Sequence, residues 1–218
     1  MENHRNHLLI AAALGLAFTR AASVFAGSAP AFTGPTVIYF VRHAENESST
    51  PNQALTQQGE ARAHIFTATV RDIPFGHVFS SHTTRSRQTV EAVAKARGLS
   101  VIQLPKPGSI VDGSTVNDKT PAKVAIKSLV EALHQLPSGS TALVGVNSDN
   151  VYAILHGLGV RVASSDQPCS FGSTCVPCVD NTCFPRDEFD NLWILIVDSV
   201  GHPPNLIHLR YGTPRMSP

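Results

Sequence analysis

Apolar residues occur along this chain in short continuous runs that alternate with stretches of helical periodicity. Residues 36–41 form an unbroken β-favouring run, which is typical of a strand that is buried on both faces in a parallel sheet. Between residues 122 and 136 the apolar positions form one stripe along a helix, and Pro137 and Gly139 follow as helix-ending residues. The same two patterns predict the remaining elements: helices at 57–72, 84–97 and 150–158, and strands at 77–80, 101–104, 141–146, 192–197 and 206–211.

The order of these elements indicates the fold class. Strands and helices alternate through most of the chain, so we expect an α/β fold, a three-layer α/β/α sandwich with a mostly parallel sheet. In folds of this kind, ligands bind beyond the carboxyl ends of the strands. The residues that directly follow the strands are therefore the first candidates for a functional site.

The first 26 residues have the pattern of a secretory signal peptide. Arg5 precedes an apolar run at residues 8–18, and small residues then lead to Ala26, where we expect cleavage. This apolar run is too short to cross a bilayer, which takes about 20 residues. The sequence thus predicts an exported chain, periplasmic or extracellular, with a mature domain at 27–218 and no membrane span. An uncleaved N-terminal anchor is the alternative.

Composition and charge bear on the class of partner. With 42% hydrophobic and 15% charged residues, the chain suits one globular domain with a sizeable core. Without residues 1–26, 15 basic and 15 acidic residues remain, and the sequence has neither a run of basic residues nor an interleaved aromatic platform. Nucleic acid is therefore not an expected partner. No pattern in the sequence indicates an oligomeric state.

Arginine and histidine follow the predicted strands at positions that would converge. Arg42 and His43 come directly after the strand at 36–41, and Arg85 lies shortly after the strand at 77–80. Arginine presents paired donors that match phosphate oxygens, and helix N-termini add backbone donors. A histidine in such a pocket can attack phosphorus through a ring nitrogen. These residues predict a pocket for a small phosphorylated substrate or ligand.

The same segments resemble the histidine phosphatase superfamily, which also contains the phosphoglycerate mutases. The resemblance is carried by residues 42–44, 55–59, 80–89, 143–155 and 189–197. It implies a phosphoglycerate mutase-like fold without metal or cofactor, in which His43 is the nucleophile and Arg42 and Arg85 bind the phosphoryl oxygens. Arg87 lies two positions past Arg85 and therefore off the same helix face, so we expect it to be solvated or structural.

One position departs from the pattern of that superfamily, whose members usually carry a second histidine after the fourth strand. Aligned backward from Val151 without a gap, Asn147 takes this position; aligned forward from Gly145, Val146 takes it. We favour Asn147, which keeps a hydrogen-bond donor but not a charge, and losing one such donor costs roughly 10²–10³ in rate. The resemblance therefore implies a slow phosphatase that hydrolyses phosphate monoesters or, alternatively, a non-catalytic domain that binds phosphate or a phosphosugar.

Many relatives in that superfamily protonate the leaving oxygen with a carboxylate, and three residues are candidates here. Asp149 shares a turn with Asn147 and is the first choice, ahead of Glu45 and Asp112.

The segment after the strand at 101–104 lacks the glutamate of mutase-like members, which argues against a phosphoglycerate mutase. Small phosphate esters, phosphosugars and phosphoproteins stay open as substrates. A histidine nucleophile must be neutral, so activity should fall well below about pH 6.5.

All four cysteines lie in an insertion at residues 161–188 without helix or strand periodicity: Cys169, Cys175, Cys178 and Cys183. An even number of cysteines in an exported chain predicts two disulfides, with three alternative pairings. A four-cysteine zinc site is the alternative, but these crowded ligands lack two separated knuckles. A redox-active pair is less favoured, because it begins no helix of a βαβ unit. By resemblance, the insertion would form a rim or lid at the pocket mouth.

Overall fold

The structure of the chain, a computed structural model, describes residues that all belong to the compact unit Phe32–Pro218. The described residues are 34–47, 53–105, 110–111, 114–115, 123–148, 150–162, 175–176, 188–198 and 203–212. Their elements, in chain order, are β1 (Thr36–Arg42), α1 (Gln57–Thr69), β2 (His77–Ser80), α2 (Thr84–Ala96), β3 (Val101–Gln103), β4 (Ile110–Val111), β5 (Ser114–Thr115), α3 (Lys123–His134), β6 (Thr141–Val146), α4 (Val151–Gly157), β7 (Arg161–Val162), β8 (Cys175–Val176), β9 (Asn191–Val197) and β10 (Asn205–Arg210).

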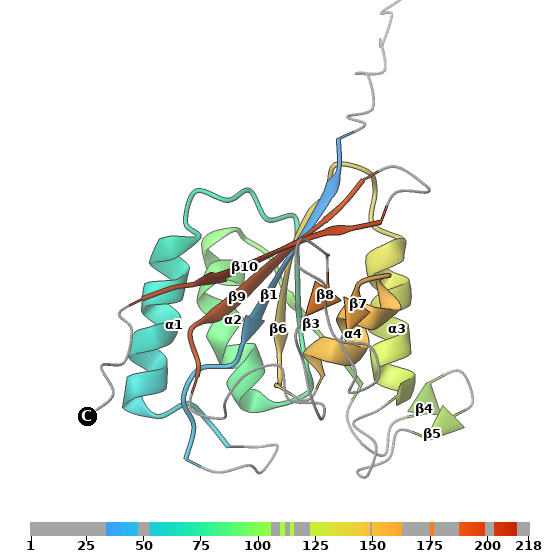
Figure 1. Cartoon of the computed structure of the whole chain (residues 1–218). Coiled ribbons are helices and arrows are strands. Elements are labelled where there is room, and N and C mark those ends of the chain that lie inside the picture. Colours follow the sequence, from blue (N-terminus) through green and yellow to red (C-terminus); the bar gives the residue numbers. More distant parts are fainter. Residues whose placement is uncertain are drawn as a thin grey trace, which may run out of the picture. The chain divides into compact units, whose positions relative to one another are not determined.

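The longer strands form one six-stranded sheet in the order β10-β9-β1-β6-β2-β3 (Figure 1). The pairs β1–β6, β6–β2 and β2–β3 are parallel, whereas β9 is antiparallel to both β1 and β10. The mostly parallel sheet that the sequence predicts is thus confirmed. β1 lies inside the sheet and is largely buried, as its continuous apolar run requires, whereas the edge strand β10 is largely exposed.

Helices cover both faces of this sheet, as a three-layer α/β/α sandwich requires (Figure 1). Ile38 and Phe40 of β1 belong to a core that includes Leu129 of α3 and Ile154 of α4. Val41 points to the other face, where its core includes residues of α1 and α2. Successive residues of a strand face opposite sides, so the unbroken apolar run of β1 supplies both cores. The predicted fold class is confirmed.

Two pairs of very short strands were not expected from the sequence. β4 pairs with β5, and β7 pairs with β8, by two residues in each strand. β7 and β8 lie within the insertion at 161–188, where the sequence shows no helix or strand periodicity. Strands of two residues are too short to produce an alternating pattern, so periodicity could not reveal them. Cys169, Cys178, Cys183 and the predicted signal peptide lie outside the described residues, and Cys175 is described by its backbone alone.

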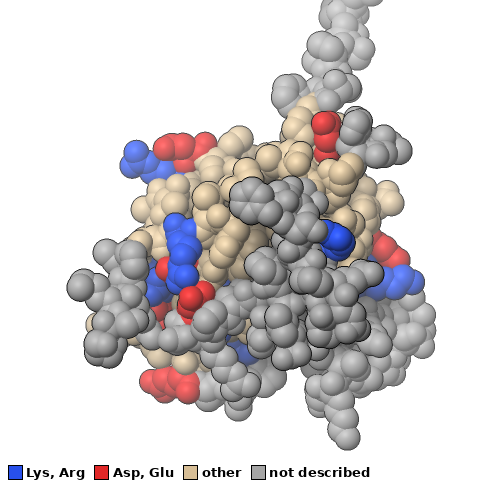
Figure 2. Space-filling view, viewed as in Figure 1, with Lys and Arg blue, Asp and Glu red and all other residues tan. Residues whose placement is uncertain are grey.

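The described surface carries charges of both signs. On the face seen in Figure 2, acidic and basic side chains are interspersed over the described residues. Some form ion pairs along a helix, such as Arg87 with Glu91 on α2 and Lys127 with Glu131 on α3. None of the helices in the described part of the chain is long and apolar enough to cross a membrane.

The start of α1 packs closely against the segment that follows β1. The side chain of Thr56 caps α1 by accepting a hydrogen bond from the Gly59 N–H at 3.1 Å, and the Thr56 N–H donates to the Glu45 carbonyl at 3.0 Å. A Cβ on Gly59 would lie 2.2 Å from the same Glu45 oxygen, a distance that no side chain can adopt without movement of the backbone. Gly59 therefore allows α1 to hold the segment that begins at His43.

We predict that Gly59→Ala destabilises the protein by about 1–3 kcal/mol, because the added methyl group forces α1 away from Glu45. The free energy of unfolding in urea measures this effect. Gly76→Ala is the matched control, since a Cβ there would meet only the Thr141 carbonyl, at 3.9 Å, which is ordinary contact. Equal stabilities of the two variants would contradict the prediction.

Candidate active site

The residues of the candidate site meet where β1, β2 and β6 end. The register places Arg42 opposite Val146 and Ser80 opposite Gly145, so the carboxyl ends of the three strands lie side by side. Two hydrogen bonds extend this pairing beyond the strands, from the His43 N–H to the Val146 carbonyl at 2.9 Å and from the Ser81 N–H to the Gly145 carbonyl at 2.8 Å. The segments that follow the three strands are thus adjacent, as the sequence predicts.

His43 is buried, with 5% of its surface exposed, and its protonation state follows from its surroundings. Nδ1 lies 2.8 Å from the Ala44 carbonyl oxygen, which can only accept, so Nδ1 carries the proton and Nε2 carries a lone pair. Burial lowers the pKa of His43 to about 3; the hydrogen bond to Ala44 opposes this shift, and the charges of Arg85 and Arg42 add to it. The imidazole is therefore neutral at pH 7, and the expected loss of the neutral form near pH 6.5 is moved to much lower pH.

Arg42 is oriented by the segment that precedes β9. Its Nη1 donates to the Glu188 carbonyl at 2.5 Å, and its guanidinium lies 4.3 Å from the centre of the Phe189 ring. The same ring lies 5.9 Å from the imidazole of His43, measured between ring centres. The Phe189 ring therefore lies against His43, the predicted nucleophile, and Arg42, one of the two predicted phosphate-binding residues.

Charged and polar groups at the end of β10 hold the Phe189 segment in place. Arg210 donates twice to the Asp190 carboxylate, at 3.0 and 2.7 Å, and forms an ion pair with Glu188 at 3.0 Å. The Tyr211 hydroxyl donates to the Phe189 carbonyl at 3.1 Å. Residues 189–197 are part of the family resemblance, but no role was expected for Phe189, Asp190 or Arg210. The signal in the sequence is one aromatic residue, Phe189, shortly before the predicted strand at 192–197.

Arg85 lies in the first turn of α2 and is buried. The Thr89 hydroxyl connects this turn to His43, because it donates to the Arg85 carbonyl at 2.8 Å and accepts from the Ala44 N–H at 3.0 Å. α2 also lies close to β6, since a Cβ on Gly145 would be 2.8 Å from the Ser86 carbonyl. Arg85 is thereby held at the same strand ends as His43.

Asn147 is buried and lies directly after β6. Its Oδ1 accepts hydrogen bonds from the hydroxyls of Ser86 at 3.0 Å and Thr83 at 3.2 Å. Val146, the other residue considered for this position, belongs to the hydrophobic core that α3 and α4 cover. The geometry therefore favours the alignment that places Asn147 at the site.

The carboxylates considered as general acids differ in where they lie. Glu45 is buried, and Arg62 donates three hydrogen bonds of 2.7 to 2.8 Å to its two oxygens. This ion pair attaches α1 to the segment after β1, so Glu45 has a structural role. Asp149, the favoured candidate, lies outside the described residues, and so does Asp112.

No group of three or more metal-binding side chains occurs among the residues that the structure describes.

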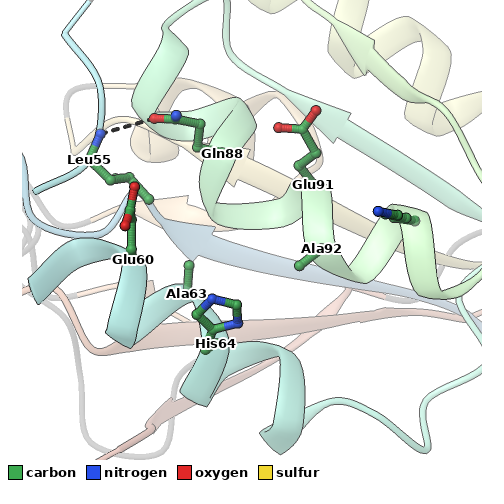
Figure 3. A pocket seen from close by; sticks show the side chains of 8 residues that line it. Leu55, Glu60, Ala63, His64, Gln88, Glu91 and Ala92 are labelled. Carbon is green, nitrogen blue, oxygen red and sulfur yellow. Dashed lines mark hydrogen bonds between the residues drawn. The ribbon is translucent and has the colours of Figure 1, made fainter. Parts of the chain in front are cut away.

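A separate groove of about 400 Å³ lies between α1 and α2 (Figure 3). It contains none of the residues predicted for the phosphate pocket. At one end, Gln88 Oε1 accepts from the Leu55 N–H at 2.9 Å, which joins the start of α2 to the segment before α1. The residues that line the groove are Leu55, Glu60, Ala63, His64, Gln88, Glu91, Ala92 and Lys95.

Residues 38–106 match the family model of the histidine phosphatase superfamily, branch 1. This stretch contains Arg42, His43 and Arg85, and it ends before Asn147. A curated relative from Erwinia tasmaniensis, named as a probable phosphoglycerate mutase, is 36% identical over 76 residues, which are 32% of this chain and 35% of the relative. The chain thus spans about a third of the length of the curated relative that it matches.

Solved structures resemble this chain over most of its length. One from Nakamurella multipartitia, named as a candidate phosphohistidine phosphatase, has 18% identity and a TM-score of 0.50, over 83% of this chain and 98% of that one. Another from Escherichia coli K-12, named as a candidate α-ribazole-5′-phosphate phosphatase, has 14% identity and a TM-score of 0.54, over 80% and 96%. At these identities the two likenesses show a shared fold.

We predict that the imidazole of His43 does not titrate between pH 8 and pH 5, because burial and two nearby arginines lower its pKa to about 3. The pH dependence of its ring proton shifts, followed by NMR spectroscopy, measures this. The spectrum of His43→Gln identifies the resonance. A titration of that resonance with a midpoint near 6.5 would contradict the prediction.

Proposed function

We propose that this chain, whose residues 38–106 match the histidine phosphatase superfamily, hydrolyses phosphate monoesters through a phosphohistidine formed on His43. The observation that carries this proposal is the state of His43, a neutral imidazole whose Nδ1 proton is donated to Ala44. This arrangement leaves the lone pair on Nε2 for attack. Arg42 and Arg85 are close enough to lower the pKa of the same ring, so a phosphoryl group at His43 would lie between two cations.

The reaction has two balanced steps. In the first, Nε2 of His43 attacks phosphorus, the bond between phosphorus and the ester oxygen breaks, and the alcohol leaves with a proton. The ring then carries a positive charge, which the hydrogen bond from Nδ1 to the Ala44 carbonyl stabilises. In the second step, water attacks phosphorus, the P–N bond breaks, inorganic phosphate leaves, and a proton of the water restores the acid that protonated the alcohol. Arg42 and Arg85 bind the phosphoryl oxygens in both steps.

Asn147 would provide a neutral donor where relatives provide a second histidine. Its position directly after β6, beside the strand end that leads to His43, supports this role. An amide can hydrogen-bond to a phosphoryl oxygen but cannot neutralise its charge, so we expect slow turnover. We propose Asp149 as the acid that protonates the leaving oxygen, because it lies two residues beyond Asn147.

A second function is a domain that binds phosphate or a phosphosugar without turnover. Two observations favour it. Neutral Asn147 stands where relatives usually carry a second histidine, and Glu45, a candidate general acid, is bound by Arg62 in an ion pair. Such a domain would bind inorganic phosphate in a saturable manner through Arg42 and Arg85. It would not release phosphate from an ester.

We further propose that the chain acts outside the cytoplasm, in the periplasm or the medium, on small phosphorylated molecules. The basis for export is the apolar run at residues 8–18 and the small residues that lead to Ala26. The four clustered cysteines are consistent with an oxidising compartment.

We predict that the mature protein releases phosphate from p-nitrophenyl phosphate without added metal, and that His43→Ala reduces the rate to the uncatalysed level. Asn147→His should raise kcat by about 10-fold or more, because it restores a charged donor at the phosphoryl group. Steady-state kinetics measure both changes. His64→Ala is the matched control, since His64 is an exposed residue in the groove between α1 and α2.

The outcomes separate the two functions. Turnover that is lost in His43→Ala and retained in His64→Ala supports the phosphatase. Phosphate binding that depends on Arg42 and Arg85, with turnover only in Asn147→His, supports the binding domain. Turnover that persists in His43→Ala would rule out the proposed nucleophile.

We predict that full-length protein made in a bacterial host is recovered outside the cytoplasm with its new N-terminus close to residue 27, as mass spectrometry would show. Its cysteines should react with an alkylating reagent only after reduction. Thiols that become reactive after chelation alone would indicate the zinc site instead. An intact N-terminus in the cytoplasmic fraction would contradict the export proposal.

A further inference from the structure

Three buried hydroxyl groups lie together between the end of β2 and the first turn of α2. Ser81, Thr83 and Ser86 have 1%, 2% and 0% of their surfaces exposed, and we refer to them as the hydroxyl cluster. Thr83 Oγ1 lies 3.1 Å from Ser81 Oγ and 2.9 Å from Ser86 Oγ. The oxygens of Thr83 and Ser86 also contact Oδ1 of Asn147, at 3.2 and 3.0 Å.

A count of protons fixes the orientation of the Asn147 amide. The hydroxyl cluster holds three hydroxyl protons, but its members share only two oxygen–oxygen contacts, and each contact takes at most one proton. At least one proton must therefore go to Asn147, since buried hydroxyls without an acceptor are costly. Only the amide oxygen can accept it, so Asn147 presents Oδ1 to the cluster. With the amide reversed, at least one of these buried protons would have no acceptor.

The opposite end of the amide is then directed away from the cluster. Both side-chain hydrogen bonds of Asn147 within the described residues run through Oδ1, which leaves the two protons of Nδ2 available. Asn147 directly follows Val146, whose carbonyl accepts from the N–H of His43 at 2.9 Å. Asn147 therefore lies at the strand end where the proposed phosphoryl group would bind.

We infer that Thr83 and Ser86 are positioning residues that turn the NH₂ group of Asn147 toward a bound phosphoryl oxygen. This inference rests on the proposed phosphate site and adds the requirement for an amide at this position. An aspartate would accept from the same hydroxyls but would present a second anionic oxygen to the phosphate. An alanine would present no donor. The side chain at position 147 must accept hydrogen bonds from the hydroxyls on one side and donate a hydrogen bond to the phosphoryl oxygen on the other. An amide does both.

The decisive variant is the double substitution Thr83→Val and Ser86→Ala, because it removes both hydroxyls that contact Asn147 and frees the amide to rotate. Affinity for inorganic phosphate is measured by calorimetry, and kcat with p-nitrophenyl phosphate is measured beside it. We expect a decrease of about 10-fold in affinity or kcat, smaller than the roughly 10²–10³ for complete loss of a donor. Ser81→Ala is the matched control, since it removes a buried hydroxyl of the same cluster that does not contact Asn147.

The same double substitution in an Asn147→Ala background separates positioning from general damage to the site. If Thr83 and Ser86 act through Asn147, the double substitution has no further effect there, since the group that they orient is already absent. An equal decrease in both backgrounds, or an equal decrease in Ser81→Ala, would overturn the inference. The phosphate affinities test it even in a protein without turnover, so its failure is distinct from failure of the proposed phosphatase.

Asn147→Asp tests the orientation without disturbing the cluster, in case the double variant does not fold. The carboxylate can accept from both hydroxyls, so thermal stability should be retained. We expect phosphate affinity at pH 7 to fall below that of Asn147→Ala, because an anionic oxygen replaces a donor. An affinity equal to that of the unsubstituted protein would mean that the side chain of residue 147 does not contact the phosphate, and the inference would be wrong.

Discussion

The parallel pairing of β6 with both β1 and β2 determines where the side chains of the candidate site lie. This register places Arg42 beside Val146 and Ser80 beside Gly145, and backbone hydrogen bonds continue it one residue further at His43 and Ser81. A shift of one residue in either pair would turn the side chains at the strand ends to the opposite face of the sheet. The apolar residues of β1 prevent such a shift, because Phe40 and Val41 fill two separate cores.

Burial, more than pairing with an acid, sets the protonation state of His43, the proposed nucleophile. A carboxylate beside His43 would favour the imidazolium, whereas the described surroundings are a backbone carbonyl, an aromatic ring and two arginines. These surroundings keep the imidazole neutral and hold one tautomer. The site therefore combines a neutral imidazole at His43 with the nearby positive charges of Arg42 and Arg85, as the proposed reaction requires.

Much of this arrangement was readable from the sequence, because it depends on local patterns. The apolar run before Arg42 and the helical spacing after Arg85 predicted the strands and helices that carry the site. The contacts that orient these residues could not be predicted, since they join distant segments. Arg42 donates to a carbonyl 146 positions away, and Asn147 accepts from hydroxyls 61 and 64 positions away. Ser81, Thr83 and Ser86 lie close together in the sequence, but only the structure shows that Thr83 and Ser86 contact Asn147.

The attachment of Arg42 to Glu188 and Phe189 has a consequence for the order in which the site is completed. His43, Arg42 and Arg85 are synthesised in the first half of the chain, whereas the carbonyl and the ring that contact Arg42 come just before β9. β9 in turn is paired with β10, and Arg210 at the end of β10 binds the acidic residues next to Phe189. A nascent chain that ends before β9 therefore lacks both of these contacts of Arg42. The proposed phosphate pocket gains them only when β9 and β10 have joined the sheet.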